Sequence, residues 1–128
     1  NYGTVFITVC DKDKEEALPL VRRFYNLGFN IEATGGTAKY LKENGIKTRA
    51  LEKINEGSNE IPEALRQGYV AYVINTCDVA TTGHNTDGYK IRSLATQNNI
   101  NMFTSLDTVK VLLDVLEETT LCVSTIDA

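Results

Sequence analysis

The stretch FNIEATGGTAKYLKENG, residues 29–45, passes from a short apolar run through two glycines into a helical pattern. Its first five residues are typical of a buried strand. Thr34-Gly35-Gly36-Thr37 reads as a tight turn, and the residues after it continue as a helix that Gly45 ends. A strand that leads into a helix in this way is the building unit of parallel α/β proteins, so this stretch indicates the fold class.

Four further apolar runs lie outward from this stretch, separated by helical patterns. Tyr69–Ile74 is the most apolar run, so we expect it at the centre of the sheet. Asp13 and Glu16 have the spacing of a capping box, and Pro19 would kink the helix after them or delay its start. The pattern predicts an α/β fold of three layers, a five-stranded parallel sheet with helices on both faces as in Rossmann-like proteins. The other strands are expected at 5–9, 46–51 and 100–103, and helices at 13–27, 60–67, 87–95 and from 105 or 107 to 116.

Composition narrows the class of protein. The chain has 128 residues, of which 42% are hydrophobic and 23% charged, which suits a single domain, 1–128. No run reaches the roughly 18–20 apolar residues of a membrane span, and a net charge of −4 argues against nucleic-acid binding. Three cysteines without a CxxC pair indicate a reducing, cytoplasmic compartment, and one histidine argues against a metal site.

Polar clusters follow four of the expected strands. In sheets of this kind, ligands bind outside the carboxyl ends of the strands, where the strand order reverses. All four clusters would emerge at that edge, so we expect a site there. The clusters are residues 11–14, 34–37, Lys53 and residues 75–87.

Thr34–Thr37 is the best single candidate for binding an anion. Glycines without a Cβ let backbone N–H groups face a ligand, and the start of the following helix favours negative charge. Lys14 and Lys53 would neutralise a phosphate, and Asn75 and Thr76 would donate hydrogen bonds to it or to a sugar. Taken alone, the same residues also fit a turn with a threonine cap, ordinary surface lysines and the end of a strand.

The ordered set DKDK (11–14), EATGGTA (32–38), KINEG (53–57), VINT (73–76) and Asp87 followed by IR (91–92) resembles the C-terminal allosteric domain of the carbamoyl phosphate synthetase large subunit, of the methylglyoxal-synthase-like fold. The resemblance implies one piece of a larger, ATP-dependent, glutamine-hydrolysing ligase of pyrimidine and arginine synthesis. It implies a nucleotide effector such as UMP or IMP, no catalysis and no cofactor in the domain itself. Its partners would be the remainder of the large subunit and the small glutaminase subunit.

The resemblance also assigns roles to individual positions. Cys77 stands where the enteric type has a phosphate-contacting threonine, and the loop after it lacks the enteric arginines, so the base of the effector is left open. Met102 and Phe103 replace the tyrosine and aspartate of ornithine-responsive members. The phosphate would be held by Lys14, Thr34, Gly35, Gly36, Thr37, Lys53, Asn75, Thr76 and Cys77, with Ile54, Asp87 and Arg92 near the base and ribose.

Three alternatives stay open. Methylglyoxal synthase shares the fold and the phosphate pocket, and Asp11 matches one of its carboxylates, but Ser58 replaces its catalytic aspartate and Glu60 lies at a different offset. A serine hydroxyl cannot replace a carboxylate as general base. His84 and Asp87 resemble the His-x-x-Asp segment of that enzyme. The IMP cyclohydrolase domain carries a similar glycine loop but continues with a segment that is absent here, and the last helix would suit a plain interaction module.

Overall fold

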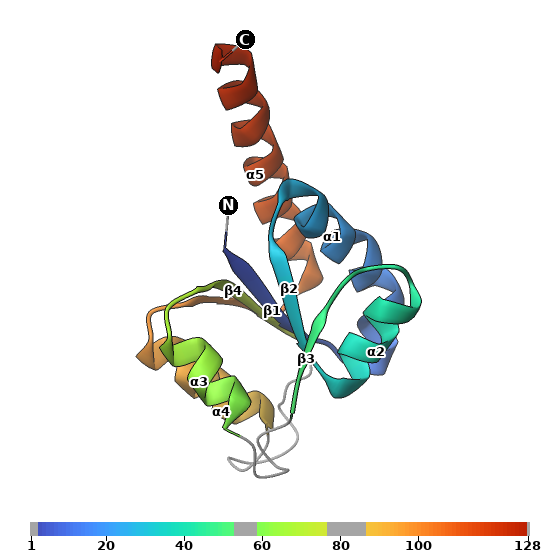
Figure 1. Cartoon of the computed structure of the whole chain (residues 1–128), viewed down its shortest axis with the longest axis vertical. Coiled ribbons are helices and arrows are strands. Elements are labelled where there is room, and N and C mark those ends of the chain that lie inside the picture. The colour runs from blue at the N-terminus through green and yellow to red at the C-terminus, as the bar shows by residue number, and fades with distance from the viewer. Residues whose placement is uncertain (1–2, 53–58, 77–86, 128) are drawn as a thin grey trace.

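The computed structural model describes residues 3–52, 59–76 and 87–127. Strands and helices alternate along the chain (Figure 1). They are β1 (Thr4–Thr8), the 3₁₀ turn η1 (Asp11–Asp13), α1 (Lys14–Leu27), β2 (Asn30–Thr34), α2 (Gly35–Glu43), β3 (Arg49–Leu51), α3 (Glu60–Arg66), β4 (Val70–Asn75), α4 (Asp87–Gln97), β5 (Asn101–Phe103) and α5 (Leu106–Asp127).

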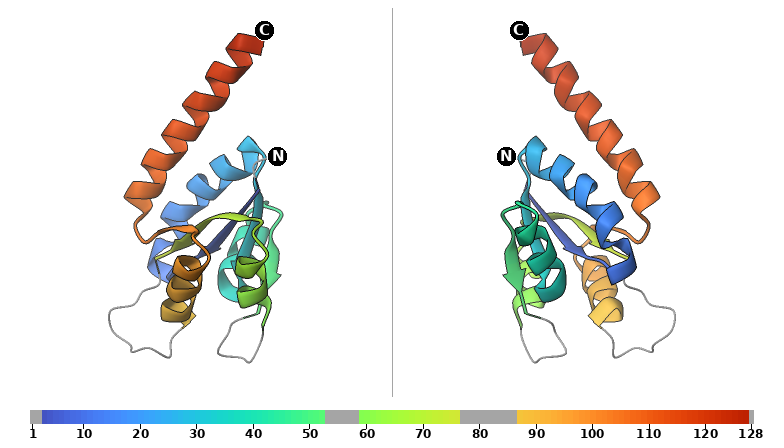
Figure 2. Two further views of the ribbon diagram at one scale, coloured as in Figure 1. Left: turned by 90° about the vertical axis from the view of Figure 1, so that its left-hand side faces the viewer. Right: turned by 90° about the vertical axis from the view of Figure 1, so that its right-hand side faces the viewer.

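The five strands form one parallel sheet in the order β3-β2-β1-β4-β5, with helices on both faces. One hydrophobic cluster joins the sheet to α1, α2 and α5, and a second joins it to α3 and α4. Figure 2 shows α3 and α4 grouped together and α5 running away from the sheet along α1. The three-layer α/β fold expected from the sequence is therefore confirmed.

The middle position of the sheet belongs to β1, so the prediction that residues 69–74 lie at the centre is wrong. Val5, Phe6 and Ile7 are each at most 1% exposed, because they are covered on both faces and flanked by β2 and β4. Strand β4 lies one position away, and its Ala71 and Tyr72 are only partly buried. Apolar content therefore marked burial on both faces but did not distinguish these two neighbouring strands.

The predicted cap of α1 and one of the two effects expected of Pro19 are not borne out. Asp13 precedes the helix, but its side chain makes no capping hydrogen bond, because its backbone (φ −100°, ψ −5°) continues the turn η1 and lacks the extended geometry typical of a capping residue. Pro19 lies inside α1 and does not delay the helix, which begins at Lys14. Gly28 ends α1 as expected, with a left-handed φ of 109° that suits glycine.

Helix α5 is longer than the sequence pattern indicated, and its second half projects beyond the sheet (Figure 1). Ser105 starts it, since its Oγ accepts a hydrogen bond from Asp107 N at 3.2 Å. Arg23 of α1 holds the middle of α5, donating to both oxygens of Glu117 at 2.7 and 2.9 Å and to Asp114 at 2.8 Å. Within the described residues, no helix is long and apolar enough to cross a membrane.

Candidate functional site

The strand order reverses between β1 and β4, since the chain moves to β2 and β3 on one side and to β5 on the other. Ligands of open parallel sheets bind at such a point, beyond the carboxyl ends of the strands. The strand ends are Thr8 in β1, Thr34 in β2 and Asn75 in β4. Val9 follows Thr8 directly, and Thr76 follows Asn75. We refer to this region, with the first turn of α2, as the carboxyl edge.

Threonine hydroxyls join the segments that meet at the carboxyl edge. Thr37 Oγ1 accepts a hydrogen bond from Val9 N at 3.2 Å, and Thr76 Oγ1 accepts one from Cys10 N at 3.3 Å. Thr34 Oγ1 donates to Thr8 Oγ1 at 3.0 Å. Thr34 and Thr37 are 4% and 3% exposed, so these contacts are largely dry. The structure thus brings together residues that are far apart in the sequence and were predicted to share a site.

Gly35 and Gly36 do not form a turn, which corrects the prediction of a tight turn over 34–37. Strand β2 ends at Thr34 and α2 begins at Gly35, so both glycines belong to the first turn of the helix. Thr34 occupies the capping position but makes no capping hydrogen bond, because its hydroxyl binds Thr8. The first N–H groups of α2 therefore have neither an intrahelical acceptor nor a side-chain cap.

Among the residues that the structure describes, a Cβ at Gly35 would meet no atom of another segment within 4 Å, and one at Gly36 would lie 3.6 Å from Lys14 Nζ. Neither glycine is needed to fit the surrounding protein, so the absent Cβ atoms leave open space above the amino end of α2. The ammonium of Lys14, from the start of α1, borders this space, and it also pairs with the exposed carboxylate of Asp11. A cation and uncapped N–H groups facing one space can hold an anion.

The structure describes some of the other predicted site residues and not others. Lys53, Ile54 and Cys77 lie outside the described residues, as do Ser58 and His84. Asp87 is the first residue of α4, and Arg92 is exposed on the same helix. Asn75 is buried at the end of β4. No group of three or more His, Cys, Asp or Glu side chains able to hold a metal occurs among the described residues.

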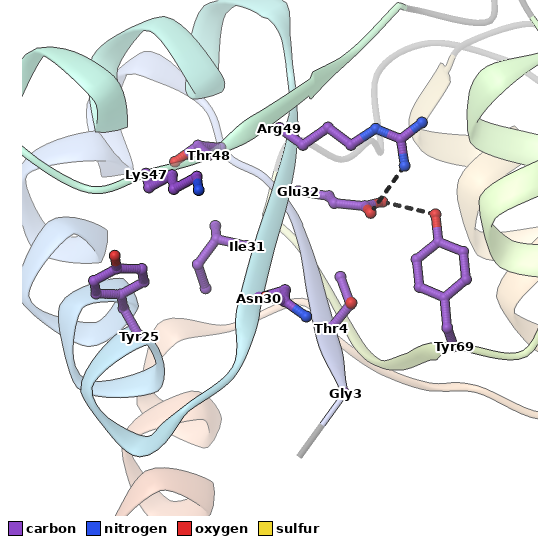
Figure 3. A pocket seen from close by; sticks show the side chains of 10 residues that line it. All are labelled: Gly3, Thr4, Tyr25, Asn30, Ile31, Glu32, Lys47, Thr48, Arg49 and Tyr69. Atoms are coloured by element: carbon purple, nitrogen blue, oxygen red, sulfur yellow. Dashed lines mark hydrogen bonds and ion pairs between the residues drawn. The ribbon is translucent and has the colours of Figure 1, made fainter. Parts of the chain in front are cut away.

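A cavity of about 700 Å³ lies at the opposite, amino edge of the strands (Figure 3). Its most buried charged side chain is Glu32, 7% exposed, which accepts hydrogen bonds from Tyr69 Oη at 3.1 Å and Arg49 at 3.4 Å. Burial, and then the charge of Glu32, raises the pKa of Tyr69 above its ordinary value. Because this carboxylate is already paired by both neighbours, the carboxyl edge is the better candidate for a ligand.

Sequence reasoning did not single out this cluster. The available signal was a glutamate inside a strand expected to be buried on both faces, which requires partners for its charge. The partners depend on the pairing register, in which Glu32 lies opposite Arg49, and on the position of Tyr69 before β4.

Comparisons with known proteins agree with the architecture. The family model "MGS-like domain" matches residues 16–104. A solved structure of methylglyoxal synthase from Elizabethkingia anophelis NUHP1 is similar, with a TM-score of 0.70 and 21% identity over 87% of this chain and 76% of that one. The crystal structure of ForH has a TM-score of 0.65 and 17% identity, over 91% and 81% of the two chains. At these identities, the two structures share the fold.

Proposed function

Since the chain belongs to the family of MGS-like domains, we propose that it binds the phosphate of a nucleotide of the UMP or IMP type at the carboxyl edge. It would do so as the allosteric domain of a carbamoyl phosphate synthetase large subunit in the cytoplasm, without catalysing a reaction itself. Its macromolecular partners would be the rest of that subunit and the small glutaminase subunit, and the parent enzyme would serve pyrimidine and arginine synthesis.

The observation that carries the proposal is the anion-binding geometry above the first turn of α2. Lys14 supplies positive charge beside Gly36 in the first turn of α2, and the start of this helix has no side-chain cap for its N–H groups. The buried hydroxyls of Thr34 and Thr37 hold α2 against β1 through Thr8 and Val9. Such a site is formed before the ligand arrives, which lowers the cost of ordering groups on binding.

Two contacts argue against methylglyoxal synthesis, the alternative that shares this fold. Removal of a proton from a triose phosphate needs a free carboxylate near the bound phosphate. The carboxylate of Asp11 is paired with Lys14, and Glu60 Oε1 accepts a hydrogen bond from Glu52 N at 2.7 Å. The nearby acid that could replace the aspartate missing at Ser58, Glu60, therefore already binds the backbone, and Asp11 already has a cationic partner.

The proposed regulation would act through thermodynamic linkage between effector binding and the conformation of the parent enzyme. An effector that binds one conformation of the parent enzyme more tightly shifts its population toward that conformation by the difference in binding free energy. The carboxyl edge would provide the affinity, and contacts of this domain with the rest of the subunit would transmit the shift.

The first test is calorimetric titration of the chain with UMP and IMP, together with an assay for methylglyoxal from dihydroxyacetone phosphate. We expect nucleotide binding without turnover. Lys14→Ala should weaken that binding by about tenfold or more, the scale of a lost charge-assisted hydrogen bond. Lys12→Ala is the matched control. It removes one positive charge from an exposed side chain two residues before Lys14, so it should leave the affinity unchanged.

Two results would contradict the proposal. Methylglyoxal formation would make the domain an enzyme, with Asp11 and Glu60 or Asp87 as the acid and base to mutate next. Nucleotide binding that survives Lys14→Ala and Lys12→Ala equally would move the site away from the carboxyl edge.

A further inference from the structure

Two threonine hydroxyls at the carboxyl edge use their oxygens as acceptors inside the protein. Thr37 Oγ1 accepts from Val9 N and Thr76 Oγ1 from Cys10 N, at 3.2 and 3.3 Å. A hydroxyl has a single hydrogen, which must then point elsewhere. Among the residues that the structure describes, neither hydrogen has an acceptor. Both groups are thereby left as hydrogen-bond donors for a ligand.

Several acceptors at the same edge already have a partner. The carbonyl oxygen of Thr76 accepts from the thiol of Cys10 at 3.4 Å, and that of Thr8 accepts from Thr76 N at 3.2 Å. The carboxylate of Asp11 is paired with Lys14, and the buried Asn75 has a partner of its own. With the uncapped N–H groups of α2 and the Lys14 ammonium included, the first turn of α2 offers a ligand mainly donors and positive charge.

We propose that this edge selects oxyanions by their protonation state, an inference that rests on the proposed function. It takes the phosphate dianion of a monoester in preference to the monoanion, and it takes sulfate as readily as the dianion. The dianion and sulfate present acceptors alone. The monoanion carries an O–H group, so it presents one acceptor fewer to these donors and one negative charge fewer to Lys14. A buried donor without an acceptor weakens binding.

Charged groups of the protein around the edge can also change their protonation with pH. The affinity for sulfate, measured at each pH, is the control for that effect. Lys14 and Asp11 border the site directly, and Asp13, Glu16 and Asp107 line a cavity of about 270 Å³ that reaches Thr76. Lys53 is predicted to join them. Sulfate and the phosphate dianion carry the same charge, so a change in any protein group acts on both alike. The ratio of the two affinities therefore isolates the proton of the ligand.

The test measures dissociation constants of sulfate, glycerol 3-phosphate and UMP for the wild-type chain from pH 5 to pH 8, at constant ionic strength. The second pKa of a phosphate monoester is about 6, so the dianion fraction falls about tenfold over this range. We expect both phosphate esters to lose about tenfold in affinity relative to sulfate between pH 8 and pH 5. Sulfate should displace UMP, and Lys14→Ala should weaken all three ligands while Lys12→Ala does not.

The inference and the proposed function fail in different ways. If the affinity of glycerol 3-phosphate relative to sulfate stays constant with pH, or if sulfate neither binds nor competes while the ester binds, the selection of the dianion is overturned. If glycerol 3-phosphate and sulfate behave as expected but UMP does not bind at any pH, the selection stands and the nucleotide proposal is overturned.

Discussion

At the scale of single residues, Gly35 is a position where folding stability and ligand affinity should respond to one substitution in opposite directions. Its φ is not in the left-handed region, and an added Cβ would meet no other segment of the described chain within 4 Å. Gly35→Ala should therefore stabilise the folded chain by about 0.4–1 kcal/mol, because alanine restricts the unfolded state. The same methyl group fills the space above α2, so UMP binding should weaken. Urea unfolding and calorimetry on the one variant measure both effects.

The matched control is Gly68→Ala. Gly68 has a φ of +84° and equally open surroundings, so the added Cβ strains the backbone without touching the carboxyl edge. This variant should lose stability and keep its affinity for UMP. If Gly35→Ala loses stability as well, or if it binds UMP like the wild type, the prediction that an anion occupies the space at Gly35 is wrong.

At the scale of elements, α5 belongs to the core through its first turns and leaves it later. Leu113 is fully buried in the cluster shared with α1 and the sheet, whereas Val111, two residues earlier, is 62% exposed. Leu113→Ala should cost about 2–5 kcal/mol of unfolding free energy, since it removes contacts and leaves a cavity. Val111→Ala should change stability by no more than about 0.5 kcal/mol. Chemical denaturation of the two variants gives the comparison.

Similar losses in both variants would mean that α5 packs on the sheet through a different face. The polar contacts fix the face independently of Leu113. Arg23 reaches Asp114 and Glu117, and these hydrogen bonds raise the pKa of Arg23 and lower that of Glu117. Their contribution to stability is small, because Glu117 is 40% exposed and water screens the pair.

The order of elements was predictable from the sequence, and their ends were less so. Apolar runs and helical spacing fix which segments are strands and helices, because those patterns reflect burial directly. The start of α2 was not predictable, because two glycines indicate a turn in any local reading and the helix is held instead by the Thr37 contact to Val9, 28 residues away. Strand β3 pairs with β2 only from Arg49 onward, so Ile46 contributes to the core from outside the strand, and Thr48 Oγ1 donates to the carbonyl of Ile46.

At the scale of the whole molecule, the topology predicted the carboxyl edge but not the amino edge. Parallel strands bring their carboxyl ends to one side, so the convergence of Thr34, Thr37 and Thr76 follows once the strands are assigned. The pairing of Glu32 with Tyr69 and Arg49 depends on register and on the 3-2-1-4-5 order, and the spacing of residues in the sequence contains neither.

Because of that cluster at the amino edge, the stability of the whole molecule should depend on pH in the alkaline range. Burial, and then the charge of Glu32, raises the pKa of Tyr69 in the folded state. The folded chain therefore holds the phenol proton more tightly than the unfolded chain. The stability from neutral Tyr69 is fully present below the unfolded pKa of about 10 and is lost as pH rises through the folded pKa. Tyr69→Phe should cost about 1 kcal/mol at neutral pH, through its hydrogen bond to Glu32.

Above the unfolded pKa, the stability curves of Tyr69→Phe and the wild type should converge, because the variant has no proton to lose at this position. Glu32→Gln offers the complementary measurement. It removes the charge of Glu32 and leaves the burial and the neighbouring Arg49, so the pKa of Tyr69 should fall toward its ordinary value. Absorbance titration of ionised tyrosine, taken as the difference from Tyr69→Phe, follows this pKa. A pKa of Tyr69 that does not change in Glu32→Gln would mean that the carboxylate does not act on the phenol, and the convergence at high pH would then rest on burial alone.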